Sequence, residues 1–224
     1  MNDHIAPPAP RPTPAPHPLG GATRFAVGAL ALAGAAWAVR AIWEIRLALA
    51  GEPASGPPDQ GNGAHRPLTG LENQYHLVVS VCGVAVVLCA VAFLGWLGRA
   101  RDNARELSGK RPRYSGLWVF LGWVVPVVNL WFPRGIVAEV HRDSAPGERL
   151  PRSVNVWWVL WLIGLFSGVG LMSADSTDQI IARAYTNVGT LLVSDAAIVG
   201  AAVAGVFVVR ALTAVQQRRE ARTG

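Results

Sequence analysis

Charged residues are scarce in this chain of 224 residues: they make up 15% of the sequence, whereas hydrophobic residues make up 51%. Soluble proteins carry about 25% charged residues. A soluble core of this size has no room for so many long apolar stretches, so lipid must be their solvent. The composition therefore excludes an ordinary soluble domain and predicts an integral membrane protein.

Lysine is almost absent, since Lys110 stands beside 19 arginines. That skew, together with abundant Ala, Gly and Pro, is typical of a GC-rich bacterial genome. The formal net charge is +6, which in a membrane protein reflects anchoring at the inner leaflet. We therefore expect the lipid bilayer as the partner of the basic residues, and no nucleic acid.

Residues that carry chemistry are few and scattered. Cys82 and Cys89 share one helical face, but about 10 Å of helix rise separates them, which excludes a disulfide between them. The five histidines lack metal-ligand spacing, and no glycine-rich loop is placed to hold a phosphate. The run 164–168 (GLFSG) does not have the spacing of a nucleophile elbow. We therefore predict no metal, no cofactor and no enzymatic activity.

Apolar stretches divide the chain into a membrane domain and two tails. Prolines crowd residues 1–24, which predicts a disordered tail, and residues 213–224 form a basic tail. The membrane domain is expected over residues 25–212. Four stretches in it are long enough to span a bilayer, with modest tilt or interfacial ends: 25–42, 77–97, 156–174 and 188–209.

A fifth uncharged stretch, residues 116–132, decides the topology. Arg40 and Arg46, at the end of the first predicted span, are assigned to neither side. If the fifth stretch does not cross the membrane, one side holds 16 of the remaining Lys and Arg residues and the other holds 2; if it crosses, each side holds 9. The positive-inside rule favours the unequal distribution. We therefore predict four passes with both termini cytoplasmic, in the cell membrane, and a re-entrant or interfacial segment that enters and leaves on the cytoplasmic side.

The composition of this fifth stretch agrees with a break in it. Pro126 removes a backbone donor and crowds the preceding turn, and Asn129 can satisfy freed backbone groups. Irregular backbone at membrane depth requires cover by protein or by a wet cavity. A proline-kinked fifth spanning helix remains the alternative. The residues expected to form the re-entrant motif are Trp123, Pro126, Asn129, Leu130, Trp131 and Pro133.

Two features are expected at the cytoplasmic boundary. Residues 134–142 place Ile136, Val137 and Val140 on one helical face, which predicts an amphipathic helix lying on the inner leaflet. Trp96 and the tryptophans at 157, 158 and 161 fall at the level where an aromatic belt is found in membrane proteins.

Asp195 is the most informative single residue, because it lies inside a predicted span. An ionisable group there costs about 2.5–3.5 kcal/mol and normally faces the bundle interior. Arg40 and Asp195 lie at similar depth, about 22–24 Å from the inner boundary at the helical rise per residue. An intramembrane Arg40–Asp195 pair is therefore possible, and the alternative is that Arg40 pairs with Glu44 one turn away.

Small residues recur along the last predicted span at helical spacing. Ala197, Ala201 and Gly205 form one row, and Gly200 and Ala204 form a second. Such rows allow close helix approach. The contact is expected either within the bundle or with a second copy of the chain.

The region from Leu97 to Arg142 resembles a bacterial family known as domain of unknown function 4328. The resemblance is carried by Arg113-Tyr114-Ser115 and by the Trp-x-x-Pro-x-x-Asn-Leu-Trp-x-Pro core that runs from residue 123 to 133. With the flanking apolar segments it extends from about residue 25 to 219. It implies a multi-pass membrane protein and no particular reaction.

The sequence as a whole predicts an all-α integral membrane protein. Its most plausible role is that of a non-enzymatic scaffold or accessory protein, with an unidentified membrane protein or a second copy as its partner. The alternative is a small transporter or channel component in which the broken segment and Asp195 line a path.

Overall fold

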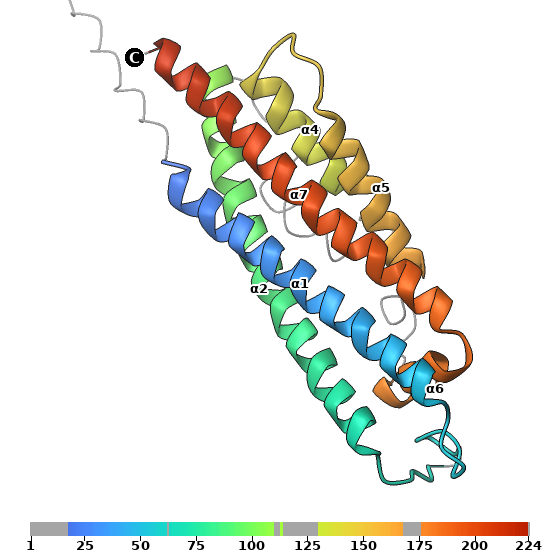
Figure 1. Cartoon of the computed structure of the whole chain (residues 1–224). Coiled ribbons are helices and arrows are strands. Elements are labelled where there is room, and N and C mark those ends of the chain that lie inside the picture. Colours follow the sequence, from blue (N-terminus) through green and yellow to red (C-terminus); the bar gives the residue numbers. More distant parts are fainter. Residues whose placement is uncertain (1–17, 62, 110–112, 114–129, 168–175, 224) are drawn as a thin grey trace, which may run out of the picture.

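The computed structural model describes residues 18–61, 63–109, 113, 130–167 and 176–223. All regular secondary structure in these ranges is helical, and one isolated β-bridge joins Asp59 to His65. Figure 1 shows the helices as one elongated bundle. They are α1 (Gly20–Ala50), α2 (Gly70–Ser108), α4 (Phe132–Ser144), α5 (Arg152–Ser167), α6 (Thr177–Thr186) and α7 (Val188–Thr223).

Local sequence signals explain where several helices begin and end. Thr69 and Glu72 form a reciprocal capping box at the start of α2, and Ser176 and Gln179 form another at the start of α6. Gly109 ends α2 in the left-handed conformation, with φ 67°. Among the described residues, three helices are long and apolar enough to cross a membrane: α1, α2 and α7. The chain is thus a helical protein with the features of a membrane protein.

Neighbouring long helices run antiparallel. Between α1 and α7, early residues of one helix meet late residues of the other: Thr23 meets Thr213, Leu30 meets Gly205, Gly34 meets Ala202 and Arg40 meets Asp195. The same order holds between α5 and α7, where Trp157 meets Gly205, Leu160 meets Gly200 and Gly164 meets Ile198. Helix α7 therefore lies between α1 and α5 and makes the largest interface with each.

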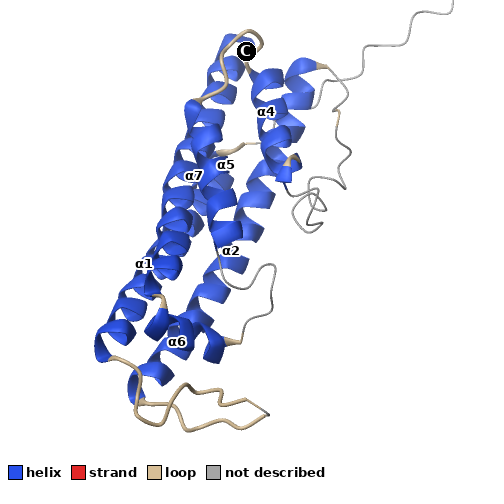
Figure 2. Ribbon diagram, turned by 90° about the vertical axis from the view of Figure 1, so that its right-hand side faces the viewer, coloured by secondary structure: helices blue, strands red, loops and turns tan. Residues whose placement is uncertain are grey.

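The bundle has two distinct ends. At the end that we call the terminal end, Arg219 of α7 donates hydrogen bonds to the carbonyl oxygens of Leu107 and Asp143. The opposite end, the loop end, contains the loop between α1 and α2 together with α6, whose Tyr185 donates to Glu72. Figure 2 shows α6 and this loop at one end and α4 at the other. Among the described helices, α1 and α5 thus run toward the loop end, and α2 and α7 run toward the terminal end.

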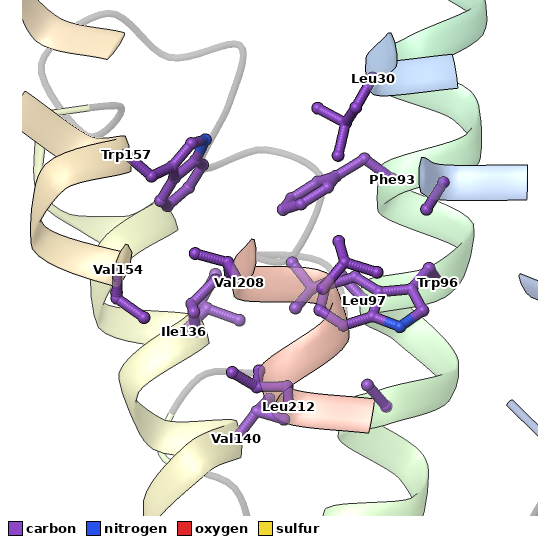
Figure 3. Packing of buried hydrophobic residues seen from close by; sticks show 14 of the residues in the cluster. Leu30, Phe93, Trp96, Leu97, Ile136, Val140, Val154, Trp157, Val208 and Leu212 are labelled. Atoms are coloured by element: carbon purple, nitrogen blue, oxygen red, sulfur yellow. The ribbon is translucent and has the colours of Figure 1, made fainter. Parts of the chain in front are cut away.

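Helix α4 occupies the position expected for an amphipathic helix, but its apolar face is turned to protein. Ile136, Val137 and Val140 are buried against α2, α5 and α7. Figure 3 shows Ile136 and Val140 at the levels of Val208 and Leu212, and Ser144 bonds Gln216. The helix predicted at 134–142 is thus present, and its apolar face packs on the bundle, where α4 runs parallel to α7; its position on the inner leaflet stays a prediction.

The tails are shorter than predicted. Residues 20–24 belong to α1, and Thr23 bonds Thr213 in α7. Residues 213–223 continue α7, where Val215 and Gln216 are buried. Both segments are polar, but each is held by hydrogen bonds within the bundle: Thr23 bonds Thr213, and Gln216 bonds Ala100 and Ser144. Residues 1–17 lie outside the described ranges.

The tryptophans expected in an aromatic belt lie at the terminal end but mostly point inward. Trp96, Trp157 and Trp158 are buried in the main apolar cluster, where Phe93 stacks near Trp96 and Trp157 at ring-centroid distances of 5.4 and 5.8 Å. Trp161 is half-buried. Burying these large rings stabilises this part of the bundle. Figure 3 shows the side chains of Phe93, Trp96 and Trp157 in this cluster.

The rows of small residues are used inside the bundle. A Cβ atom on Gly34 would lie 3.2 Å from the Cβ of Ala202, and one on Gly200 would lie 2.9 Å from Leu160. At Gly164 the clash is with Ile198, whose Cγ1 would be 2.7 Å away. Close approach of α1 and α5 to α7 therefore depends on glycine at these crossings.

Replacing Gly164 with Ala should destabilise the protein by about 1–3 kcal/mol, the usual range for overpacking a tight contact. Ile198 is β-branched and has little freedom to move aside. Gly83→Ala is the matched control, since a Cβ there meets nothing within 4 Å. Thermal unfolding of both variants in the same detergent would test this. Equal melting temperatures would show that the α5–α7 crossing tolerates a wider separation.

Candidate functional site

A buried ion pair joins α1 to α7 in the half of the bundle nearer the loop end. The Nη2 atom of Arg40 lies 2.8 Å from Oδ1 of Asp195, and both side chains are almost fully buried. The structure thus brings together the two residues that sequence reasoning singled out inside the spans. Their meeting follows from the antiparallel order of α1 and α7, which places residue 40 opposite residue 195.

Two further residues join this pair. Arg40 Nε lies 3.0 Å from Oε1 of Glu44, and the hydroxyl of Tyr75 in α2 donates to the same oxygen at 2.7 Å. Glu44 and Tyr75 are fully buried. The two alternatives for Arg40, a pair with Asp195 or with Glu44, therefore occur together. We call Arg40, Glu44, Tyr75 and Asp195 the charge cluster.

Sequence reasoning named Glu44 only as an alternative to Asp195 and did not identify Tyr75. The apolar run of α1 stops near residue 42, but the helix continues to Ala50 and Glu44 is buried. Arg40 therefore contacts carboxyl groups from two helices. The usable signal was the i, i+4 spacing of Arg40 and Glu44, which predicts a pair on one helical face.

Apolar groups enclose the charge cluster on both sides along the bundle. Toward the loop end lies a group of buried residues from four helices: Leu47, Tyr75, Ile180, Ile181, Ala184 and Leu191. Toward the terminal end, Cys82 packs with Ala36 and donates to its carbonyl oxygen at 3.3 Å. Arg40 also lies over the ring of Trp37, 4.0 Å from its centroid. In such surroundings a guanidinium retains its charge only because carboxylates accompany it.

A second polar network ties down the loop end. Arg66 forms a bidentate pair with Glu72 (2.9 and 2.7 Å), and Tyr185 of α6 donates to the same carboxylate at 2.8 Å. The bond to Glu72 raises the pKa of Arg66 further above its ordinary value. Burial, followed by the bond to Glu72, raises the pKa of Tyr185. All three groups thus keep their usual charge states across the physiological range.

Asp178 of α6 forms a third polar contact at the loop end. His76 Nε2 lies 3.1 Å from its Oδ1, and His65 Nδ1 lies 3.4 Å from its Oδ2. These contacts join α6 to α2 and to the preceding loop. No group of three metal-binding side chains with suitable geometry occurs within the described ranges.

The predicted re-entrant motif is only partly visible. Trp123, Pro126 and Asn129 lie outside the described residues. Leu130 is half-buried, Trp131 is 65% exposed, and Pro133 is buried in the first turn of α4. Pro133 suits that position, because the first turn of a helix needs no backbone donor there.

Neutralising one carboxylate of the charge cluster should cost little, and neutralising both should cost much. After Asp195→Asn, Arg40 keeps Glu44, and after Glu44→Gln it keeps Asp195, so each loss should stay near 0.5–1.5 kcal/mol. The double variant strands the guanidinium and should lose about 3–5 kcal/mol. The exposed Glu148→Gln is the control. Additive losses in detergent-resistant folded protein across the cycle would reject a shared arginine.

The comparisons with known proteins agree with the resemblance noted in the sequence. No curated protein and no solved structure matches the chain. One family model matches residues 71–214, from the start of α2 into α7; this range includes Tyr75 and Asp195 and begins after α1. Because the match covers more than half of the chain, the protein belongs to the family described as domain of unknown function (DUF4328).

Proposed function

We propose that this chain is a four-pass protein of the bacterial cell membrane with both termini in the cytoplasm. The passes would be α1, α2, the segment that begins with α5, and α7. Support comes from the position of the arginines: those in the last turns of α2, in α4 and in the C-terminal half of α7 all belong to the terminal end. The positive-inside rule assigns such an end to the cytoplasm.

On this topology, residues 116–132 would enter and leave the membrane on the cytoplasmic side. The observation that supports this is the position of its two neighbours in the chain. Gly109, before it, ends α2 at the terminal end, and α4, after it, packs on α2 and α7 at the same end. A chain that leaves from and returns to one end of the bundle need not cross it.

We propose further that the protein acts through contacts, as a non-enzymatic scaffold or accessory subunit. The observation that supports this role is the location of the polar and charged side chains. Within the described helices, the charge cluster is paired internally, and two pockets have mostly apolar linings, with Ser80 as the polar exception. The larger helices present many bare hydrophobic residues outward, Leu77, Val84 and Val91 on α2 among them. Such a surface suits lipid and other membrane helices.

The alternative function is that of a small transporter or channel component. It is favoured by one observation, the charge cluster itself, because ionisable residues at membrane depth commonly mark ion pathways. The apolar groups on both sides of the cluster oppose it, since a conducting path needs polar or wet walls.

Cysteine labelling should test the topology. In a background without Cys82 and Cys89, Glu148→Cys should react with a membrane-impermeant maleimide only after the cells are opened. Ala64→Cys, in the loop between α1 and α2, should react in intact cells. Both positions are exposed, so accessibility is not limited by folding. Labelling of Glu148→Cys from outside would restore a fifth spanning helix.

Reconstitution should separate the two functional candidates. In vesicles the purified protein should show no proton, sodium or potassium flux above that of protein-free vesicles. In native membranes it should migrate on a native gel in a complex larger than its own 23.8 kDa. A flux that disappears in Asp195→Asn, with Glu148→Gln as the control, would instead support the transporter.

A further inference from the structure

The charge cluster has one more acid than base. Arg40 faces two carboxyl groups, Glu44 from its own helix and Asp195 from α7. Arginine remains protonated in proteins, so the cluster would carry one net negative charge if both acids were ionised. A net charge with no counter-ion is expensive in apolar surroundings, and such groups neutralise by binding a proton instead.

The geometry leaves room for that proton. Glu44 Oε2 and Asp195 Oδ2 are buried and have no hydrogen-bond partner among the described residues. Both carboxyl groups lie against the same guanidinium, with Glu44 Oε1 3.0 Å from Nε and Asp195 Oδ1 2.8 Å from Nη2. A proton held by one acid and donated to the other would satisfy both orphan oxygens at once.

From these contacts we propose that the charge cluster is a proton-binding site that holds a single proton between Glu44 and Asp195. This goes beyond the scaffold role, which does not require an exchangeable ligand. Besides the cluster residues, Cys82 of α2 is the titratable side chain that faces it from the terminal side, and its thiol is bonded to the carbonyl of Ala36.

The partners of each carboxyl group decide where the proton resides. Glu44 Oε1 has two stabilising contacts: the Tyr75 hydroxyl donates a hydrogen bond to it, and Arg40 Nε lies 3.0 Å away. Asp195 Oδ1 has one, Arg40 Nη2 at 2.8 Å. Hydrogen bonds and nearby positive charge stabilise the ionised form of an acid, so Glu44 is the carboxylate and Asp195 is the protonated partner.

The polar network nearest to the cluster lies on its loop side. Tyr75 lies one helical turn from Glu72, which bonds Arg66 and Tyr185 near the surface. In the other direction α1 presents only apolar buried residues, Ala36, Ala33 and Leu30, which lead into the main apolar cluster.

Infrared spectroscopy of the protein in lipid vesicles tests the proposal, because a protonated carboxyl group has a distinct C=O stretching band. At neutral pH the wild type should show one such band, and it should shift when aspartate, but not glutamate, carries an isotope label. Labelling changes no side chain, so this part holds even if a variant fails to fold. No band at neutral pH, or a band that follows the glutamate label alone, would overturn the assignment.

Variants give a second, independent pattern. Asp195→Asn and Glu44→Gln should each abolish the band, because one acid then balances one arginine. Arg40→Gln should double its intensity, since both acids then bind protons. Asp178→Asn, at the loop end, should leave it unchanged. A band that survives both acid variants belongs elsewhere, and a band removed by adding sodium at constant pH would show a metal cation as the ligand.

Discussion

The arrangement of the bundle depends on one guanidinium shared by two carboxyl groups in apolar surroundings. Arg40 is the link: its Nε atom faces Glu44 within α1, and its Nη2 atom faces Asp195 in α7. Tyr75 extends the contact to α2. Apolar surroundings offer these side chains no other hydrogen-bonding partners. The contacts of the charge cluster therefore hold α1, α2 and α7 in register with one another. Sliding α7 by one turn would remove the contact between Asp195 and Arg40 and leave a buried carboxyl group without its partner.

Close helix contact makes that register possible. Glycine at 34, 164, 200 and 205 lets α1 and α5 approach α7 until side chains of the neighbouring helix fill the space. The apolar cluster at the terminal end then fixes the tilt of the helices through its aromatic rings. Charge sets which residues face each other, and small residues set how near the helices come. Neither alone would specify this bundle, because lipid competes with protein for every apolar surface.

Much of the fold and of the charge cluster could be predicted from the sequence, because membrane helices are recognised by their length and hydropathy. The apolar runs, the paired depth of Arg40 and Asp195 and the rows of small residues all follow from spacing along a helix. What could not be predicted is the direction in which amphipathic elements face. Ile136 and Trp96 are equally suited to a lipid boundary and to a protein core, and only the position of neighbouring helices decides. The burial of Glu44 could not be predicted for a related reason, because α1 remains helical and buried after its hydropathy falls.

The location of Glu44 has a consequence for how the protein is made. Arg40 and Glu44 lie one turn apart in the first helix, so Arg40 has a counter-charge on its own helix as soon as that helix forms. Asp195 belongs to the last helix and is synthesised long after its cation. It gains that cation only when α7 packs on α1. Formation of the full charge cluster therefore requires the last helix, whereas the Arg40–Glu44 pair does not.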